Sequence, residues 1–376
     1  MVAQSALADS AEQQDLRDTV RRLLRDKAPL AALREGADTG AGFDRKLWDQ
    51  LAELGLTALA VPEEYEGLGQ TALETAVVFE EMGRGLYFGP YLASVGLAVP
   101  ALLASGDESA CADLLPGIGT GETIGTVAVI ESDGSWSTEA TDTEAVADGD
   151  GWLLTGTKDI VLDGADADLL LVTARHDNQV SLFAVQADAT GLDRTRLESL
   201  DLSRSLARVS FADTPARLVG DRGGAPALVA GVLDQVLVAL AAEQAGGAAA
   251  CLELSVEYAK TRKQFGQPIG SFQAVAHNCV DMLHGVEFSR ACARYAAAAR
   301  AEDAPDARES ARVAAAYCGE AFRAIAVQTV HVHGGTGFTW EHDAHLYYRR
   351  AWSARHLFGG LDDHYRAIAD LALRDA

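Results

Sequence analysis

The chain has 376 residues and a formal net charge of −24, from 31 basic and 55 acidic residues, and 48% of its residues are hydrophobic. A chain of this length and composition can bury a core and form two or three packed units. The acidic balance argues against a nucleic-acid-binding surface, because a phosphate backbone needs a basic one. It still allows a small anionic ligand, which needs only a few arginines or backbone N–H groups.

Cysteine usage and the first residues bear on the compartment. The five cysteines, an odd number without CxxC spacing, indicate reduced thiols and a cytoplasmic location. The N-terminal segment MVAQSALADSAEQQ has no basic flank followed by an apolar run, so we expect no signal peptide. No apolar stretch reaches the length of a membrane span. The apolar segment from Ala227 to Leu240 is interrupted by polar residues, and we expect a buried helix there.

The first third of the chain carries helical patterns only. Helices are expected over 9–28, 44–54, 71–82 and 91–104, and around Cys111. Asp44 is a typical N-cap, and Gly55 and Gly83 are interpreted as helix ends. The prediction is an all-helical domain over residues 1–123.

The pattern changes at Ile124. Short runs rich in Val, Ile, Leu, Thr and Phe alternate with Gly/Asp turns as far as Gly220, and Gly149–Asp150–Gly151 is typical of a hairpin turn. These features predict an antiparallel β-domain over residues 124–220. Residues 221–376 are helical again, with long Ala-rich segments over 227–260, 272–301 and 306–332 and a last one after Asp343. Their lengths predict a four-helix bundle, and the fold class is therefore α+β.

One stretch between two long helices, Tyr258–Phe272, reads YAKTRKQFGQPIGSF. Gly and Pro break the helical pattern there, which predicts a helix end, a tight connection and a new helix start. The basic residues Arg262 and Lys263 stand beside Phe265. Cations at a helix C-terminus favour the helix dipole and also bind phosphate, so a capped helix turn and a phosphate contact both remain open.

A second glycine-rich stretch, HVHGGTGF, follows the helix expected over 306–332. Gly334, Gly335 and Gly337 allow the backbone to approach a ligand and to direct N–H groups at an anion, although an ordinary helix–helix turn explains them too. The stretch does not follow a strand, so we do not interpret it as a Rossmann fingerprint. The histidines of this region are His331, His333, His342 and His345. Their spacing does not match a zinc motif such as HExxH, and we expect solvated loop histidines and no metal site.

Long motifs in the first and last thirds carry a resemblance to a known family. They are LWDQLAELGLTALAVPEEYEGLG, VVFEEMGRG, EYAKTRKQFGQPIGSFQAVAH and HGGTGFTWEHDAHLYYRR. With the helical–β–helical order, they make the sequence similar to the acyl-CoA dehydrogenase family over essentially its whole length. The resemblance implies FAD-dependent removal of hydrogens from the α and β carbons of an acyl-CoA thioester. It also implies electron-transfer flavoprotein or another electron acceptor as a partner, and a homo- or heterotetramer built from dimers.

The resemblance assigns cofactor contacts residue by residue. Arg262 and Phe265 match the family's contacts to the diphosphate and adenosine part of a neighbouring subunit's FAD. His331, Gly334 and Gly335 match the positions where a Gln and the glycines meet the same cofactor. The Gln is replaced by His331, which still donates a hydrogen bond.

The positions of the family's general base are apolar in this chain. The Glu that usually precedes a Gly-Thr, soon after the Arg that Arg349 matches, is replaced by Phe358. Some members place the Glu early in the first long helix of the bundle, where this chain has Val236 followed by Leu237. A phenyl ring or an aliphatic side chain cannot take a proton, so the catalytic residue is unknown. Candidate bases are Glu243, Asp362 and Asp363, each of which is also explained as a capping or solvated carboxylate.

The segments that face the flavin in the family also depart from its pattern. VIESDGSWS, Val129–Ser137, stands where a Glu-Pro-Gly-x-Gly-Ser-Asp-like run is usual. Ile160 and Leu162 replace a Trp and a hydroxyl-bearing residue. That hydroxyl normally approaches flavin N5, and its loss removes a donor where negative charge develops.

Three functions therefore remain open. The first is a competent FAD-dependent acyl-CoA dehydrogenase whose base is unassigned. The second is a subunit with a degenerate active site that holds FAD beside a catalytic paralogue in a heteromeric enzyme. The third is a flavoprotein of this fold that acts on a non-thioester substrate. The loss of polar groups at several positions favours the second on mechanism.

Overall fold

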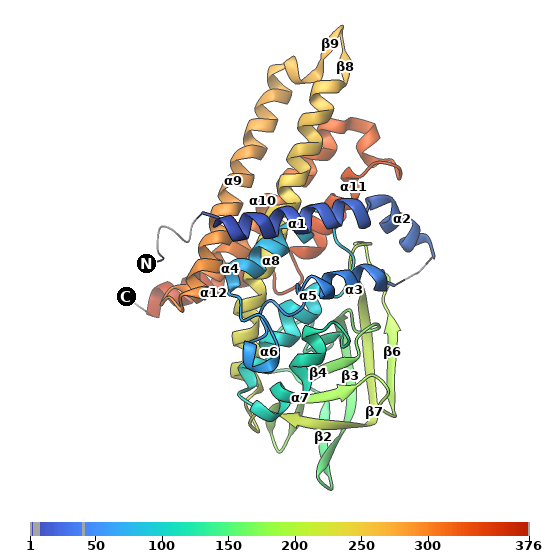
Figure 1. The fold of residues 1–376 in the computed structure, drawn as a ribbon, viewed down its shortest axis with the longest axis vertical. Helices are drawn as coiled ribbons and strands as arrows, with labels where there is room; N and C mark the ends of the chain where they lie inside the picture. The colour runs from blue at the N-terminus through green and yellow to red at the C-terminus, as the bar shows by residue number, and fades with distance from the viewer. Residues whose placement is uncertain (1, 3–7, 40–41, 375–376) are drawn as a thin grey trace.

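The computed structural model describes residues 2, 8–39 and 42–374 and arranges them as three consecutive regions (Figure 1). The outermost residues of the two expected end domains, 1, 3–7 and 375–376, lie outside the described residues. The helices of the first region are α1 (Ala11–Lys27), α2 (Leu30–Thr39), α3 (Arg45–Glu53), α4 (Ala72–Arg84), α5 (Tyr91–Ala93), α6 (Val99–Ser105) and α7 (Glu108–Gly119). A π-helical segment, η3 (Ser94–Ala98), joins α5 to α6, and a short 3₁₀ turn, η2 (Glu63–Tyr65), precedes α4.

Local sequence signals account for the starts of these helices. The Asp44 cap is confirmed, since its carboxylate accepts hydrogen bonds from two backbone N–H groups in the first turn of α3. Capping boxes begin α1, with Ser10 and Gln13, and α4, with Thr71 and Glu74. Each box satisfies backbone N–H groups that the helix itself leaves unpaired.

The middle region is one seven-stranded sheet. Its strands are β1 (Gly125–Ala128), β2 (Glu144–Asp148), β3 (Gly151–Leu162), β4 (Leu169–His176), β5 (Gln179–Gln186), β6 (Leu192–Arg196) and β7 (Leu206–Val219). The strand order is β1-β4-β2-β3-β7-β5, β6 pairs with β7, and β5 also pairs with β4, so the sheet closes on itself. The expected hairpin turn joins β2 to β3, where Asp148 pairs with Gly151.

The expectation of a purely antiparallel sheet is corrected in one respect. β1 runs parallel to β4, with Gly125 opposite Leu169, and β2 touches β4 in parallel at Glu144. A parallel pair requires a long crossover, which the β2–β3 hairpin between β1 and β4 provides. β2 and β6 are both short and mostly exposed, so neither carries a clear hydrophobic pattern in the sequence.

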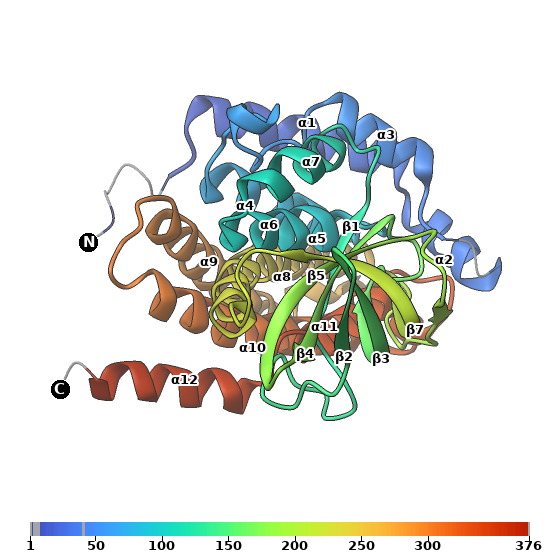
Figure 2. The ribbon, with the colours of Figure 1, turned by 90° about the horizontal axis from the view of Figure 1, so that it is seen from below.

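The third region is built on three long helices. Its elements are α8 (Ala225–Thr261), β8 (Lys263–Gln264), β9 (Gln267–Pro268), η4 (Ile269–Ser271), α9 (Gln273–Ala301), α10 (Ala307–His333), η5 (Gly334–Phe338), α11 (Ala344–Ala354) and α12 (Leu361–Arg374). The segment after Asp343 forms two helices rather than one, and α12 reaches outward from α10 (Figure 2). The β8–β9 hairpin stands at one end of the molecule and the sheet at the other (Figure 1).

The first and third regions share one core because α4 packs directly on α8 and α9. Gly83 does not end α4, as expected from the sequence, but lies within it. A Cβ on Gly83 would lie 1.8 Å from the carbonyl oxygen of Glu243 on α8, and a Cβ on Gly246 would lie 1.8 Å from the carbonyl oxygen of Glu80. Both glycines therefore serve the close approach of two helices.

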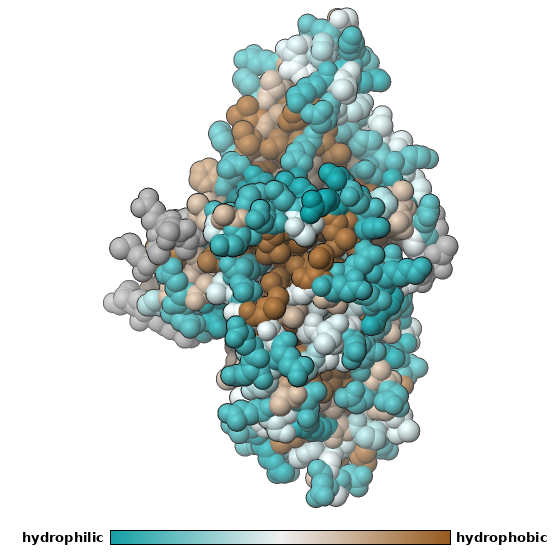
Figure 3. Space-filling view, viewed as in Figure 1, coloured by the Kyte–Doolittle hydropathy of each residue, from teal (hydrophilic) through white to brown (hydrophobic). Residues whose placement is uncertain are grey.

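The expectation that no apolar stretch reaches the length of a membrane span is corrected for α8, which alone among the described residues is long and apolar enough to cross a membrane by length and composition. The larger part of its most apolar window is buried, so α8 is the core helix of this fold. Figure 3 shows hydrophilic side chains over most of one face, with hydrophobic side chains gathered across its middle beside α1.

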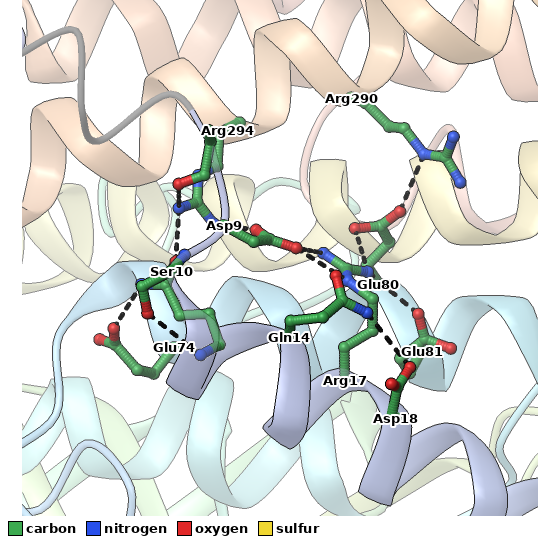
Figure 4. A network of polar contacts seen from close by, with 12 residues as sticks. Asp9, Ser10, Gln14, Arg17, Asp18, Glu74, Glu80, Glu81, Arg290 and Arg294 are labelled. Carbon is green, nitrogen blue, oxygen red and sulfur yellow. Dashed lines mark hydrogen bonds and ion pairs between the residues drawn. The ribbon is translucent and has the colours of Figure 1, made fainter.

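An ion-pair network fastens α1 to α4 and α9 (Figure 4). Arg17 contacts Glu80 and Glu81 at 2.7 and 3.0 Å, and Arg290 on α9 contacts Glu80 at 3.1 Å. Arg294 on α9 reaches Asp9, just before α1, at 2.6 Å. The network holds the N-terminal helix across the side of the bundle.

Candidate functional site

The first candidate cofactor contacts lie on the β8–β9 hairpin. Phe265 at its turn is 91% exposed, which is unusual for a large apolar side chain, and it has a positive φ of 51°. Such a backbone conformation is costly for a bulky residue, and it is typical of functional loops. Arg262, the residue that ends α8, is exposed, and no described residue forms a hydrogen bond or ion pair with its guanidinium. The hairpin therefore presents the unpaired guanidinium of Arg262 and the exposed ring of Phe265.

The second set of candidate contacts lies on the loop η5, at the end of α10. His331, Gly334 and Gly335 are all exposed. A Cβ added at Gly334 or Gly335 would meet nothing within 4 Å, and Gly334 has a positive φ of 60°. The backbone here faces open space that a ligand can approach closely.

Ring contacts bring the two sets to the same end of the bundle. Tyr258 lies one turn before Arg262, and its ring centroid is 4.4 Å from that of His333, which directly precedes Gly334. The expectation that the histidines of this region are solvated is wrong for two of them. His333 and His345 are 4% and 5% exposed, because aromatic and imidazole rings pack against them. Among the described residues, no three His, Cys, Asp or Glu side chains group to hold a metal ion.

The two positions that the sequence resemblance assigns to the family's base are buried in apolar surroundings. Val236 on α8 is fully buried, and Phe358, between α11 and α12, is 2% exposed. Trp136, from the segment Val129–Ser137, packs edge-on against Phe358 with ring centroids 5.0 Å apart. The Trp136 indole N–H also donates a hydrogen bond to the Leu357 carbonyl at 3.1 Å. Sequence patterns did not predict this pair, because its two members lie far apart in the chain.

A buried ion pair supports the start of the same segment. Glu131 accepts hydrogen bonds from the Lys158 ammonium at 2.5 Å and from the backbone N–H groups of Asp142 and Thr143. Burial lowers the pKa of Lys158 to about 8, and Glu131 opposes that fall. Burial raises the pKa of Glu131, but Lys158 and the hydrogen bonds outweigh burial and bring it below the ordinary value. The ion pair therefore stabilises the start of the segment that contains Trp136.

Leu162, at the end of β3, is 5% exposed and, as a leucine, has no hydroxyl group. Ile160 is partly exposed, and its backbone forms an isolated β-bridge with Ile130. Of these two positions, Leu162 is buried and Ile160 is not.

The candidate base Glu243 is held by two buried arginines. Arg204 and Arg350 both donate to its Oε1, the latter at 2.7 Å. Arg350 also contacts Asp201 at 3.1 Å and the carbonyl of Tyr87 at 3.2 Å. This cluster joins the loop before β7 to α8, α11 and the first region. A carboxylate engaged by two guanidinium groups is not free to receive a substrate proton.

The other candidate bases lie at the start of α12, and both are exposed. The Asp363 carboxylate accepts a hydrogen bond from the backbone N–H of Gly360 at 2.9 Å and contacts Arg366 at 3.1 Å. Asp363 therefore caps a helix, which is one of the two interpretations that the sequence allowed. Asp362 has no hydrogen bond or ion pair among the described residues.

A small cavity of about 10 Å³ lies beside the ion cluster. Its lining includes Phe79, Tyr87, Leu162, Asp163 and Glu243. A cavity of this size holds one water at most, whereas ligand pockets span roughly 300–1,000 Å³. Asp163 was not singled out from the sequence. Burial and the negative charge of Asp166 raise the pKa of Asp163 to about 7. The signal in the sequence that could have found it is an Asp at the end of an apolar strand.

Three family models match consecutive parts of the chain. They are described as acyl-CoA dehydrogenase N-terminal domain, over residues 10–122, middle domain, over 126–213, and C-terminal domain, over 224–372. This chain belongs to the acyl-CoA dehydrogenase family. The acyl-CoA dehydrogenase IpdE2 of Mycobacterium tuberculosis is 35% identical over 347 residues, which cover 92% of each chain.

Two further proteins are similar to this acyl-CoA dehydrogenase over nearly all of its length. A solved variant of the Tcur3481–Tcur3483 steroid acyl-CoA dehydrogenase is 32% identical with a TM-score of 0.83, and the match covers 97% of this chain and 98% of that one. The acyl-CoA dehydrogenase FadE34 of M. tuberculosis is 34% identical over 99% of this chain but only 49% of its own length. The expected family and its three-region fold are confirmed, and the chain is an oxidoreductase of a family that typically binds FAD.

Proposed function

We propose that this chain is the base-less subunit of a heteromeric acyl-CoA dehydrogenase, in which it holds the adenosine–diphosphate end of FAD for a catalytic paralogue. One observation carries the proposal. The position of the family's base is occupied by Phe358, and Trp136 closes over it from the segment that faces the flavin in the family. No general base is therefore available at that position. The assigned cofactor contacts, called here the clamp, remain exposed: Arg262, Phe265, His331, Gly334 and Gly335.

The residues at the hairpin end fit the diphosphate and adenosine part of FAD. Arg262 is exposed without a protein partner, as a phosphate contact requires. Gly334 and Gly335 leave their backbone open to close approach by an anion. Phe265 offers an exposed ring. FAD bound to the assembly supplies hydride acceptance during α,β-desaturation of the thioester, and this chain's residues would hold and orient it.

The residues at the other end do not fit the reacting ring of a flavin. Trp136, Phe358 and Leu162 are packed against protein, and the cavity that Leu162 lines holds no more than a water. The distance along α8 supports a division of labour between subunits. Val236 and Arg262 lie at opposite parts of that helix, roughly 39 Å apart at 1.5 Å per residue. The clamp of one chain therefore binds a flavin whose reaction takes place in another part of the assembly.

The relatives support a heteromeric setting. The steroid acyl-CoA dehydrogenase that matches over nearly its whole chain carries two names, Tcur3481 and Tcur3483. FadE34 has as much sequence again beyond the part that this chain matches. We expect an acyl-CoA as substrate of the assembly, electron-transfer flavoprotein or another acceptor as its oxidant, and a cytoplasmic location.

Flavin content tests the proposal. The chain is purified alone and after co-expression with a paralogue from the same genome, and flavin absorbance is measured per chain. We expect little flavin alone, and flavin that an acyl-CoA bleaches in the co-purified assembly. Stoichiometric FAD that an acyl-CoA bleaches in the chain alone would show a self-sufficient dehydrogenase. Bound FAD that no thioester bleaches in either preparation would favour a flavoprotein that acts on another substrate class.

A substitution of Arg262 tests whether this residue binds the cofactor or only supports the fold. Arg262→Ala is expected to remove most flavin from the assembly without changing its size on gel filtration, because no described residue forms a hydrogen bond or ion pair with the Arg262 side chain. The matched control is Arg366→Ala on α12, an arginine that is 75% exposed at a distant position. Full flavin retention by the Arg262 variant would refute the clamp assignment.

A further inference from the structure

Three aromatic rings form a tilted stack next to the clamp. The centroid of the His333 imidazole is 4.4 Å from the centroid of the Tyr258 ring and 4.4 Å from that of the His342 imidazole, with interplanar angles of 33° and 55°. Tyr258 belongs to α8, and its carbonyl accepts a hydrogen bond from the Arg262 N–H at 2.8 Å. His333 ends α10, and Gly334 follows it. One imidazole thus touches the base of the hairpin and the base of the glycine loop.

Hydrogen bonds define which nitrogen of each imidazole carries a proton. His333 Nδ1 lies 2.7 Å from the Thr329 carbonyl, which can only accept, so Nδ1 bears the hydrogen. His342 Nδ1 accepts the backbone N–H of Ala344 at 3.1 Å, so it is unprotonated in this arrangement. Ala344 is the first residue of α11. The neutral form of His342 therefore pairs an N–H group that the helix start would otherwise leave free.

Charged groups around the stack do not favour a cation there. From α2, Arg34 binds Asp343 at 2.7 Å and so engages the carboxylate next to His342. From α11, Arg349 and the stacked His345 add no negative charge. From α8, the facing group is the neutral phenol of Tyr258. The surroundings select neutral imidazoles.

We propose that His333 and His342 are positioning residues of the cofactor clamp, and that their protonation releases the clamp's hold on FAD. The inference rests on the proposed function, because it takes the clamp as the flavin site. Protonation of His342 puts a hydrogen on Nδ1 against the Ala344 N–H and breaks that bond. It also places a positive charge at the N-terminus of α11, which the helix dipole disfavours. A second charge on His333 repels the first at stacking distance.

The direction of the pH effect follows from burial. Burial lowers the pKa of His333 and of His342 below the ordinary value of 6.5. The folded clamp therefore holds fewer protons than the opened loop, and its stability is fully present above pH 6.5 and falls as the pH drops below that value. FAD bound to the assembly should leave as the pH falls.

The test is flavin retention by the flavin-loaded assembly between pH 8 and pH 5, measured as the fluorescence of FAD released after desalting. His342→Asn keeps an acceptor for the Ala344 N–H but cannot titrate. His333→Phe keeps the ring stack but cannot titrate. Each variant is expected to retain flavin at pH 8 and to move the midpoint of acid release down by about one pH unit. The control is His277→Phe, an exposed histidine on α9, which should leave the midpoint unchanged.

The outcomes are distinguishable from failure of the proposed function. If the wild-type assembly binds flavin at pH 8 and loses it on Arg262→Ala, but both histidine variants release flavin at the wild-type midpoint, the positioning role is wrong and the clamp stands. If Arg262→Ala leaves flavin bound, the clamp itself is wrong. Should His333→Phe fold poorly, His342→Asn alone decides, since its substitution lies at a helix start and leaves the stack's other rings in place.

Discussion

Replacement of Glu243 by Gln tests the ion cluster that joins the three regions. The Glu243 side chain is 6% exposed, and its Oε1 receives hydrogen bonds from Arg204 and from Arg350, whose side chains are 4% and 3% exposed. Glutamine keeps the size of the side chain and one acceptor oxygen but removes the negative charge. Asp201 would then be the carboxylate left to contact both guanidinium groups.

The magnitude follows from the burial of all partners. Removal of one member of a buried ion pair costs about 3–5 kcal/mol, because a charge is left without compensation in a poorly solvated place. Hydrogen bonds to charged groups contribute roughly 1.5–3 kcal/mol each, and Gln retains a weaker version of one. We therefore expect Glu243→Gln to lower the free energy of unfolding by about 3 kcal/mol.

The appropriate assay is equilibrium unfolding in guanidinium chloride. An unchanged m-value there separates a loss of stability from a change in compactness. The matched control is Glu257→Gln on the same helix. Its side chain is 68% exposed and, among the described residues, forms an ion pair with Lys260 alone, so the substitution should change stability by less than about 0.5 kcal/mol. A Glu243→Gln variant as stable as the wild type would refute the reasoning. If that variant also lost acyl-CoA-dependent bleaching in the assembly, Glu243 would be the base instead.

Two further substitutions test packing and a buried acid. Asp163→Asn should raise the melting temperature at pH 8 but not at pH 4. Burial raises the pKa of Asp163 from 3.8 to about 7, so the folded protein loses stability as the pH rises through that window, on the order of 4 kcal/mol at most. Gly83→Ala should lower the melting temperature, because its Cβ would lie 1.8 Å from the Glu243 carbonyl oxygen and force α4 from α8, at a cost of about 1–3 kcal/mol.

Each of these has a control in the same chain. Gly231→Ala, within helix α8, meets nothing within 4 Å and should leave the protein equally or slightly more stable. Equal melting temperatures for Gly83→Ala and Gly231→Ala would contradict the close-packing argument. For Asp163→Asn, a difference from the wild type that is the same at pH 4 and pH 8 would show that charge is not its cause.

The sequence by itself determined the order of helical, β and helical regions, and it located the hairpin and the glycine loop. Periodicity and Gly/Pro breaks are local signals, so they survive without knowledge of the fold. The long motifs carried the family, which the comparisons confirm. The apolar side chains at Phe358 and Val236 could also be read directly, and the structure buries both.

Only the tertiary structure decided what those residues meet. Trp136 and Phe358, and Glu243 with its two arginines, come together from distant parts of the chain, and no local pattern encodes such contacts. Gly83 was interpreted as a helix end because its role depends on a neighbouring helix. His333 was expected to be solvated, since burial by Tyr258 and His342 arises only when α8, α10 and the following loop pack together. Close packing selects residues by their partners in space, which sequence spacing does not reveal.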